Sequence, residues 1–219
     1  MKDGKATFII DFEKMKEKKQ IDAENSLLDV YDELFQYIEK KANLREKVRA
    51  KHIFSYKAGI PKSEVMDPDM HMHFEHWFAF DYVTVFGSRM FDLFIRDKKD
   101  KMSKSMLELS GFLLLMSLEP VRLKKVEKSV IIYDSLLKNE TKEATPFIFP
   151  AEGEAGELVL MRTVQVGYKQ MKIGPTIRLN DEGQQKILKD FHIDEHTNIL
   201  NQRKHLKEYG IDYLRNKKT

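Results

Sequence analysis

The stretch VRLKKVEKSVIIY, residues Val121–Tyr133, decides the fold because the hydrophobic pattern changes its period there. Before it, apolar residues recur every three or four positions, as in amphipathic helices. From it onward, short β-branched and aromatic runs alternate with turn-forming sequences, as in strands. Pro120 stands at the change, and a proline cannot continue a helix. The sequence therefore predicts an α+β protein whose helical half ends at Pro120.

Five strand-like runs follow this boundary, separated by sequences rich in Gly, Pro and Asp. They are Val121–Val126, Val130–Tyr133, Thr145–Phe149, Leu158–Val166 and Met171–Ile177. Short, closely spaced strands are typical of a small barrel of the SH3-like or OB-like type. We expect a helical region at 1–120, a small β-barrel or sheet at 121–179 and a helical region at 180–219. We also expect them to share a core as one integrated domain.

Capping patterns predict where several helices begin. Ser26 and Asn43, each with an acidic residue three positions later, predict helices at 26–41 and at about 43–52. Gly and Pro residues then indicate a loop at about 55–72. Ser105 repeats the capping pattern before Met106–Leu118, which is so apolar that we expect it to be the central core helix.

The segment His73–Tyr82, HFEHWFAFDY, holds the densest group of aromatic residues in the chain. That many aromatic side chains in one helix predict burial on more than one side. Asp81 stands among them, and an unpaired carboxylate is costly to bury. We therefore expect Asp81 to pair with a backbone amide or with a basic side chain.

Three histidines near the start of this helix suggest a metal site. His71, His73 and His76, together with Glu75, could supply ligands to zinc or iron. The motif resembles the HxHxDH box of metallo-β-lactamase-type hydrolases, with Glu75 in place of Asp. In that family the box follows a strand, whereas here it enters an aromatic helix. The alternative is that these are ordinary histidines at a helix entrance, and otherwise we expect no cofactor.

Basic residues beside aromatic ones suggest a nucleic-acid interface. In small barrels, aromatic side chains stack on bases while lysines and arginines contact phosphates. The candidates lie in the second helix and around the strands: Arg45, Lys47, Arg49, Lys51, Arg122, Lys124, Lys128, Lys169 and Lys172. The alternative is a set of ordinary solvated helix and sheet faces.

Composition excludes several other classes of protein. With no cysteine, the chain has no disulfide, thiolate zinc site or thiol nucleophile. Its first twenty residues lack the apolar core of a signal peptide, and no apolar run is long enough to cross a bilayer, so we expect a cytoplasmic protein without a membrane partner. The formal charge of +3 is far below that of a dedicated nucleic-acid binder. Glycine-rich phosphate loops and the GxSxG elbow are also missing.

The aromatic segment carries a resemblance to a known family. FEHWFAFDY at Phe74–Tyr82, followed by Gly87 and a Met-Phe-Asp-Leu-Phe helix, resembles an uncharacterised bacterial family. That family has an F-x-E-W-F-x-F-D-Y-type helix and a strand-rich segment, often followed by a SEC-C zinc motif. Here His76 stands where the family has tryptophan, and the SEC-C cysteines are missing. The resemblance spans about Phe74–Leu179, implies a binding or accessory role and transfers no catalytic residue.

Three functional hypotheses follow. The first is a non-enzymatic binding protein that docks on nucleic acid or on a ribonucleoprotein such as the ribosome. The second is a protein-interaction adaptor or homo-oligomer, in which the aromatic surface around Trp77 or the C-terminal helix contacts another polypeptide, with methionines as adaptable contacts. The third is a metal-dependent hydrolase built on the three histidines. The sequence names neither the ligand nor the oligomeric state.

Overall fold

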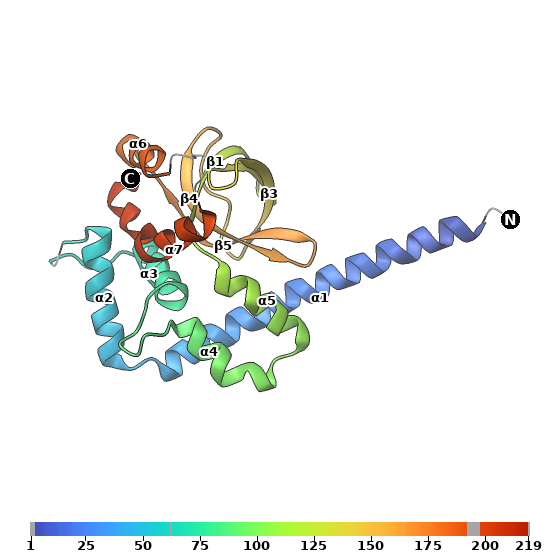
Figure 1. The fold of residues 1–219 in the computed structure, drawn as a ribbon, viewed down its shortest axis with the longest axis horizontal. Helices are drawn as coiled ribbons and strands as arrows, with labels where there is room; N and C mark the ends of the chain where they lie inside the picture. The colour runs from blue at the N-terminus through green and yellow to red at the C-terminus, as the bar shows by residue number, and fades with distance from the viewer. Residues whose placement is uncertain (1–2, 62, 192–197, 219) are drawn as a thin grey trace.

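The computed structural model describes residues 3–61, 63–191 and 198–218 (Figure 1). It confirms an α+β fold in which a helical first half precedes a five-stranded sheet. The α-helices are α1 (Asp3–Lys41), α2 (Leu44–Ala58), α3 (Pro68–Phe80), α4 (Met90–Lys98), α5 (Lys104–Leu115), α6 (Asp181–Asp190) and α7 (Ile199–Tyr209). Short 3₁₀-helices, η1 (Lys99–Lys101) and η2 (Gly210–Asn216), follow α4 and α7.

The sheet contains the five strands expected after the helical half. They are β1 (Glu119–Val126), β2 (Ile131–Ser135), β3 (Glu140–Phe147), β4 (Leu158–Val166) and β5 (Lys169–Arg178). The hydrogen-bonded order is β1-β2-β3-β5-β4, and β4 also pairs with β1, so every strand has two neighbours. All pairs are antiparallel except β3 with β5. The sheet is therefore mixed, and its pairing closes on itself.

The two faces of β4 belong to different hydrophobic clusters. Val159 and Met161 pack with residues of β1, β2 and β3 in a small cluster within the sheet. Leu160, Val164 and Val166, on the opposite face, join the larger cluster formed by the helices. This alternation is the period of two expected for a strand. Because the large cluster includes residues of α1, α3, β4 and β5, the helical half and the sheet share a core.

Several helix boundaries differ from those predicted. The first helix begins at Asp3, so Ser26 is not its cap: its hydroxyl donates to the Asp22 carbonyl at 2.8 Å and lies 3.0 Å from the Ser105 hydroxyl. Ser103, and not Ser105, caps α5 by accepting from the Met106 amide. Asn43 does cap α2, but this helix continues to Ala58, and α3 begins at Pro68. The loop between α2 and α3 is therefore shorter than expected.

The expectation of a central core helix at 106–118 was wrong. Helix α5 ends at Leu115, before Pro120, which belongs to β1 and pairs with Leu160. Only one side of the helix is buried. The apolar side chains of its other side are exposed: Leu107, Phe112, Leu114 and Leu115. The prediction used apolar content alone. The helix buries only the side chains that recur at helical spacing on one side, and the apolar residues outside this stripe stay in solvent.

A buried ion pair joins the end of α3 to the sheet. Asp81 follows α3 directly, and its carboxylate accepts a hydrogen bond from the guanidinium of Arg162 in β4. The two side chains are 2% and 0% exposed. Arg162 therefore occupies the helix-facing side of β4, beside Leu160 and Val164. The expected pairing of Asp81 with a basic partner is confirmed.

We predict that breaking this pair destabilises the whole protein. Asp81→Ala leaves the guanidinium of Arg162 buried without its partner, and such a change costs about 3–5 kcal/mol of unfolding free energy. Urea denaturation followed by far-UV circular dichroism measures the loss. The double variant Asp81→Leu with Arg162→Met removes both charges and should recover most of it. A single variant within about 1 kcal/mol of the parent would show that the pair contributes little.

Candidate functional site

The four basic residues predicted on α2 do not form one surface. Arg45 and Arg49 share one side of the helix, and Lys47 and Lys51 lie on the other, beside α3. Arg49 donates to the Tyr82 hydroxyl at 2.7 Å and contacts the carboxylate of Glu46 at 3.2 Å. The helix therefore offers its charges to two separate regions of the surface.

The basic residues of β1 lie on the exposed face of the sheet. Arg122 and Lys124 are both exposed, and so is Lys128 in the turn that follows. Two of these side chains already have partners within the protein. Lys124 contacts Asp134 at 2.9 Å, and Arg122 donates to the Gly156 carbonyl at 3.0 Å. These residues form a solvated sheet face with internal partners.

The two lysines predicted on β5 differ in accessibility. Lys169 is exposed and lies 3.4 Å from the carboxylate of Glu24 on α1. Lys172 has no exposed surface, and its ammonium donates to the Pro150 carbonyl at 2.8 Å. Burial lowers the pKa of Lys172 to about 8. The expectation that Lys172 contacts phosphate is therefore corrected, because a nucleic acid cannot reach it in this structure.

The three histidines point in different directions around α3. His71 is half exposed and lies 3.4 Å from Glu75, whereas His73 and His76 are buried. His76 donates from Nδ1 to the Met72 carbonyl at 2.8 Å, so its Nε2 accepts from the Tyr31 hydroxyl. Within the described residues, no three His, Cys, Asp or Glu side chains are placed to hold a metal ion.

Close contact with the sheet explains why His76 is enclosed. Gly174 of β5 has φ +72°, a left-handed conformation that glycine adopts readily. A side-chain carbon at this position would lie 2.5 Å from Cδ2 of His76, so only glycine lets the strand approach the ring. Burial lowers the pKa of His76 to about 3 and that of His73 well below its ordinary value. Both imidazoles therefore act as neutral core residues.

A cationic cavity lies between α2, the end of α3 and α7. It encloses about 430 Å³, and Trp77 and Tyr82 form part of its wall. Cationic side chains from three parts of the chain line it: Arg49, Lys57, Arg89, Lys204 and Lys207. We call this group the basic cavity. Its acidic lining residues are Asp81, which is already paired with Arg162, and Glu208.

Two lysines of α7 give the basic cavity its uncompensated charge. Lys57 and Arg49 have carboxylate partners in Asp212 and Glu46. For Lys204 and Lys207, in contrast, the described part of the chain provides no carboxylate within ion-pair distance. Lys207 donates to the Leu114 carbonyl at 2.6 Å, and burial lowers its pKa. An anion entering the cavity would meet these two ammonium groups.

Arg89 adds a donor that the protein itself leaves unused. Its guanidinium lies 3.7 Å from Asp92, and its Nε is buried without a hydrogen-bond partner among the described residues. A buried donor without a partner carries a desolvation cost that a bound acceptor would relieve. The cavity therefore combines the two α7 lysines with the guanidinium of Arg89, a lining that suits a phosphate or carboxylate group.

A short loop beside the basic cavity exposes an aromatic side chain. Val83 bridges to Arg89, and the Thr84 amide and hydroxyl both donate to the Ser88 carbonyl. These bonds fix the base of the loop. Phe86 at its tip is 86% exposed. The loop therefore holds an aromatic ring in solvent beside the basic cavity.

Of the basic residues that line this cavity, only Arg49 was predicted from the sequence as a binding residue. Lys57 and Asp212 pair although 155 positions separate them, so the convergence of α2 with the C-terminal segment cannot be seen locally. The basic composition of the segment from Arg203 onward was the available signal. It indicated charge near the C-terminus without indicating which surface that charge would join.

The chain matches no family model, no curated protein and no solved structure. Its resemblance to the uncharacterised bacterial family therefore stays an expectation. In the described part of the chain, no helix combines the length and apolar character needed to cross a bilayer.

We predict that stability falls as the pH is lowered through the ordinary histidine range. The ordinary pKa is 6.5, and burial lowers that of His76 to about 3, so only the unfolded chain takes up a proton there between these values. The free energy of unfolding should drop by about 2 kcal/mol from pH 7 to pH 5 through His76 alone. Urea titrations at both pH values measure the drop.

His76→Gln should remove this share of the pH dependence. The matched control is His52→Gln, because His52 is exposed on α2 and should leave the slope unchanged. If the parent protein and the His76 variant lose the same free energy between pH 7 and pH 5, then His76 is not held neutral by burial.

Proposed function

We propose that the protein binds single-stranded nucleic acid, as free RNA or within a ribonucleoprotein, at the basic cavity. The observation that carries the proposal is that Lys204 and Lys207, which have no carboxylate partner among the described residues, line the same cavity as Arg89. Backbone phosphates carry the charge and the acceptor oxygens that such a site requires. In this proposal the role is cytoplasmic and involves binding without catalysis.

The exposed loop supports a single strand as the partner. Proteins that bind single strands combine a positively charged groove with aromatic rings on which unpaired bases stack. Val83 and Arg89 belong both to this loop and to the cavity wall, and Phe86 lies at the loop tip between them. A phosphate in the cavity and a stacked base on Phe86 would together use both features. Bases inside a duplex are not available for such stacking.

We also propose that the closed sheet is a small barrel of the OB-like type. The order β1-β2-β3-β5-β4 with a parallel β3–β5 pair departs from sequence order, which supports a Greek-key arrangement over a simple meander. Barrels of this kind often bind oligonucleotides on their own strands. Here Arg122, Lys124 and Lys125 of β1 have partners in a neighbouring strand or in the adjoining loops, which favours the basic cavity as the primary site.

We predict salt-sensitive binding of a labelled oligouridine or oligothymidine. Each phosphate contact on a single strand contributes about 0.7 to the slope of log K against log salt concentration. Fluorescence anisotropy should therefore show affinity falling steadily as KCl rises from about 50 to 200 mM. A complete lack of binding at the lowest salt concentration would contradict the proposed function.

Charge reversal should locate the site. Lys204 is exposed and has no carboxylate partner among the described residues, so Lys204→Glu should weaken binding roughly tenfold and lower the salt slope by about 0.7. Lys128→Glu is the matched control, because Lys128 is equally exposed but lies at the sheet. If the control weakens binding more than Lys204→Glu does, the site lies on the sheet.

The Phe86 ring should contribute to affinity without affecting salt dependence. Phe86→Ala should cost about 1–3 kcal/mol of binding free energy, the range found for base–aromatic stacking. Phe86→Trp keeps an aromatic face and should bind as well as the parent. The same anisotropy titrations distinguish these variants. Equal affinities for the alanine and tryptophan variants would exclude stacking at this position.

A further inference from the structure

The first half of α1 projects from the rest of the protein. The helix has 39 residues and is therefore roughly 58 Å long. Figure 1 shows its N-terminal turns extending away from all other elements. Every side chain from residue 11 to residue 19 is exposed, and the first buried one is Gln20, which donates to the Val166 carbonyl. The helix thus meets the body of the protein near residue 20.

The projecting half continues the apolar stripe that the second half buries. Phe12 lies eighteen residues before the buried Val30, which is about five complete turns, so both point from the same side of the helix. Met15 lies about one turn after Phe12, at the edge of this stripe. The two side chains are 57% and 58% exposed. The stripe therefore packs against other elements in the second half of α1, whereas its described part at residues 11–19 stays in solvent.

A projecting helix of this kind has little support in water. Most helical stability in proteins comes from burying an amphipathic face, and the side chains from residue 11 to residue 19 bury none of theirs. Contiguous apolar surface can mark a contact with another protein, and Phe12 and Met15 are neighbours on one side of the helix. The projecting segment is therefore suited to pack against another helix.

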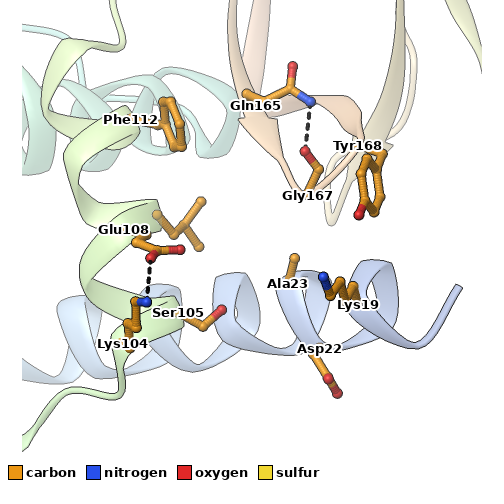
Figure 2. Close-up of a pocket in the computed structure, with 11 residues that line it drawn as sticks. Lys19, Asp22, Ala23, Lys104, Ser105, Glu108, Phe112, Gln165, Gly167 and Tyr168 are labelled. Atoms are coloured by element: carbon orange, nitrogen blue, oxygen red, sulfur yellow. Dashed lines mark hydrogen bonds and ion pairs between the residues drawn. The ribbon is translucent and has the colours of Figure 1, made fainter. Parts of the chain in front are cut away.

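A groove lies next to α1 at the point where it leaves the body. It encloses about 640 Å³ between α1, α5 and the β4–β5 turn, with Phe112 and Tyr168 on opposite sides (Figure 2). These two aromatic side chains are 50% and 54% exposed. The floor is formed by α1, through Lys19, Asp22 and Ala23.

The groove and the projecting stripe lie on the same side of α1. Lys19 stands seven residues after Phe12, and Asp22 stands seven after Met15, which is close to two turns in each case. A helix that packs on Phe12 and Met15 and runs toward the body therefore enters the groove. It would cover the exposed rings of Phe112 and Tyr168.

We propose that two copies of the chain pair through the first halves of α1, antiparallel, with the N-terminal turns of each helix lying in the groove of the other copy. In this arrangement Phe12 of each copy faces Met15 of the other across a two-fold axis. Such an interface is isologous, because the same surface serves both copies. It also places the two bodies at opposite ends of the helix pair.

Charge complementarity supports a second copy as the occupant. Asp11 and Lys18 are seven residues apart, so they flank the Phe12–Met15 stripe on one edge. In an antiparallel pair centred between Phe12 and Met15, the same edges of the two helices meet. Asp11 of each copy then faces Lys18 of the other, which gives two opposite-charge contacts per dimer. Flanking charges of this kind set the orientation of paired helices.

Sedimentation velocity on the full chain tests the proposal. The parent protein should sediment with twice the chain mass of 25.8 kDa and dissociate on dilution. Met15→Glu places a charge in the shared stripe and should give a monomer. Ile21→Glu is the matched control, because Ile21 is 51% exposed on the opposite side of α1 and should leave the dimer intact.

A charge exchange tests the antiparallel register. Asp11→Lys and Lys18→Asp should each weaken dimerisation, because each creates two like-charge contacts, and the double variant should restore it. A parent protein that stays monomeric at every concentration would overturn the proposal. Dissociation by Ile21→Glu as readily as by Met15→Glu would also overturn it, and so would a double variant weaker than both single ones.

Discussion

The ion pair between Asp81 and Arg162 is the contact on which the rest of the structure depends. Two charges with almost no exposed surface must meet across the boundary between the end of α3 and β4, and each is costly to bury without the other. This requirement fixes where α3 ends relative to the sheet. Gly174 then lets β5 approach His76 on the same helix, so α3 is held against the sheet at two points.

The same constraint shapes the proposed binding surface. The carboxylate of Asp81 is paired with Arg162, and it also attracts the ammonium group of Lys207 at the basic cavity. The loop that carries Phe86 begins directly after α3, so its position also follows from the end of that helix. The pair therefore positions both a wall of the cavity and the loop beside it. Dimerisation through α1 would leave the basic cavity accessible, since α1 does not line it.

Local chemistry made much of the fold predictable. Five strands, the change of period after Pro120 and the burial of Asp81 beside a basic partner all follow from residue type and spacing. The helix start predicted at Ser26 was wrong. Ser26 has the sequence pattern of a helix cap, but it lies inside α1 and contacts Ser105. The cavity could not be predicted, because its residues come together through contacts between α2 and the C-terminal segment, and sequence spacing carries no information on such contacts.

The buried ion pair makes the helical half and the sheet one cooperative unit. Native-state hydrogen exchange in increasing denaturant tests this cooperativity, by comparing the amides of α3 with those of β4. We expect the most protected amides of both elements to open with the same free energy and the same denaturant dependence. Exchange of the α3 amides through a separate, lower-energy opening, while β4 stays protected, would contradict it.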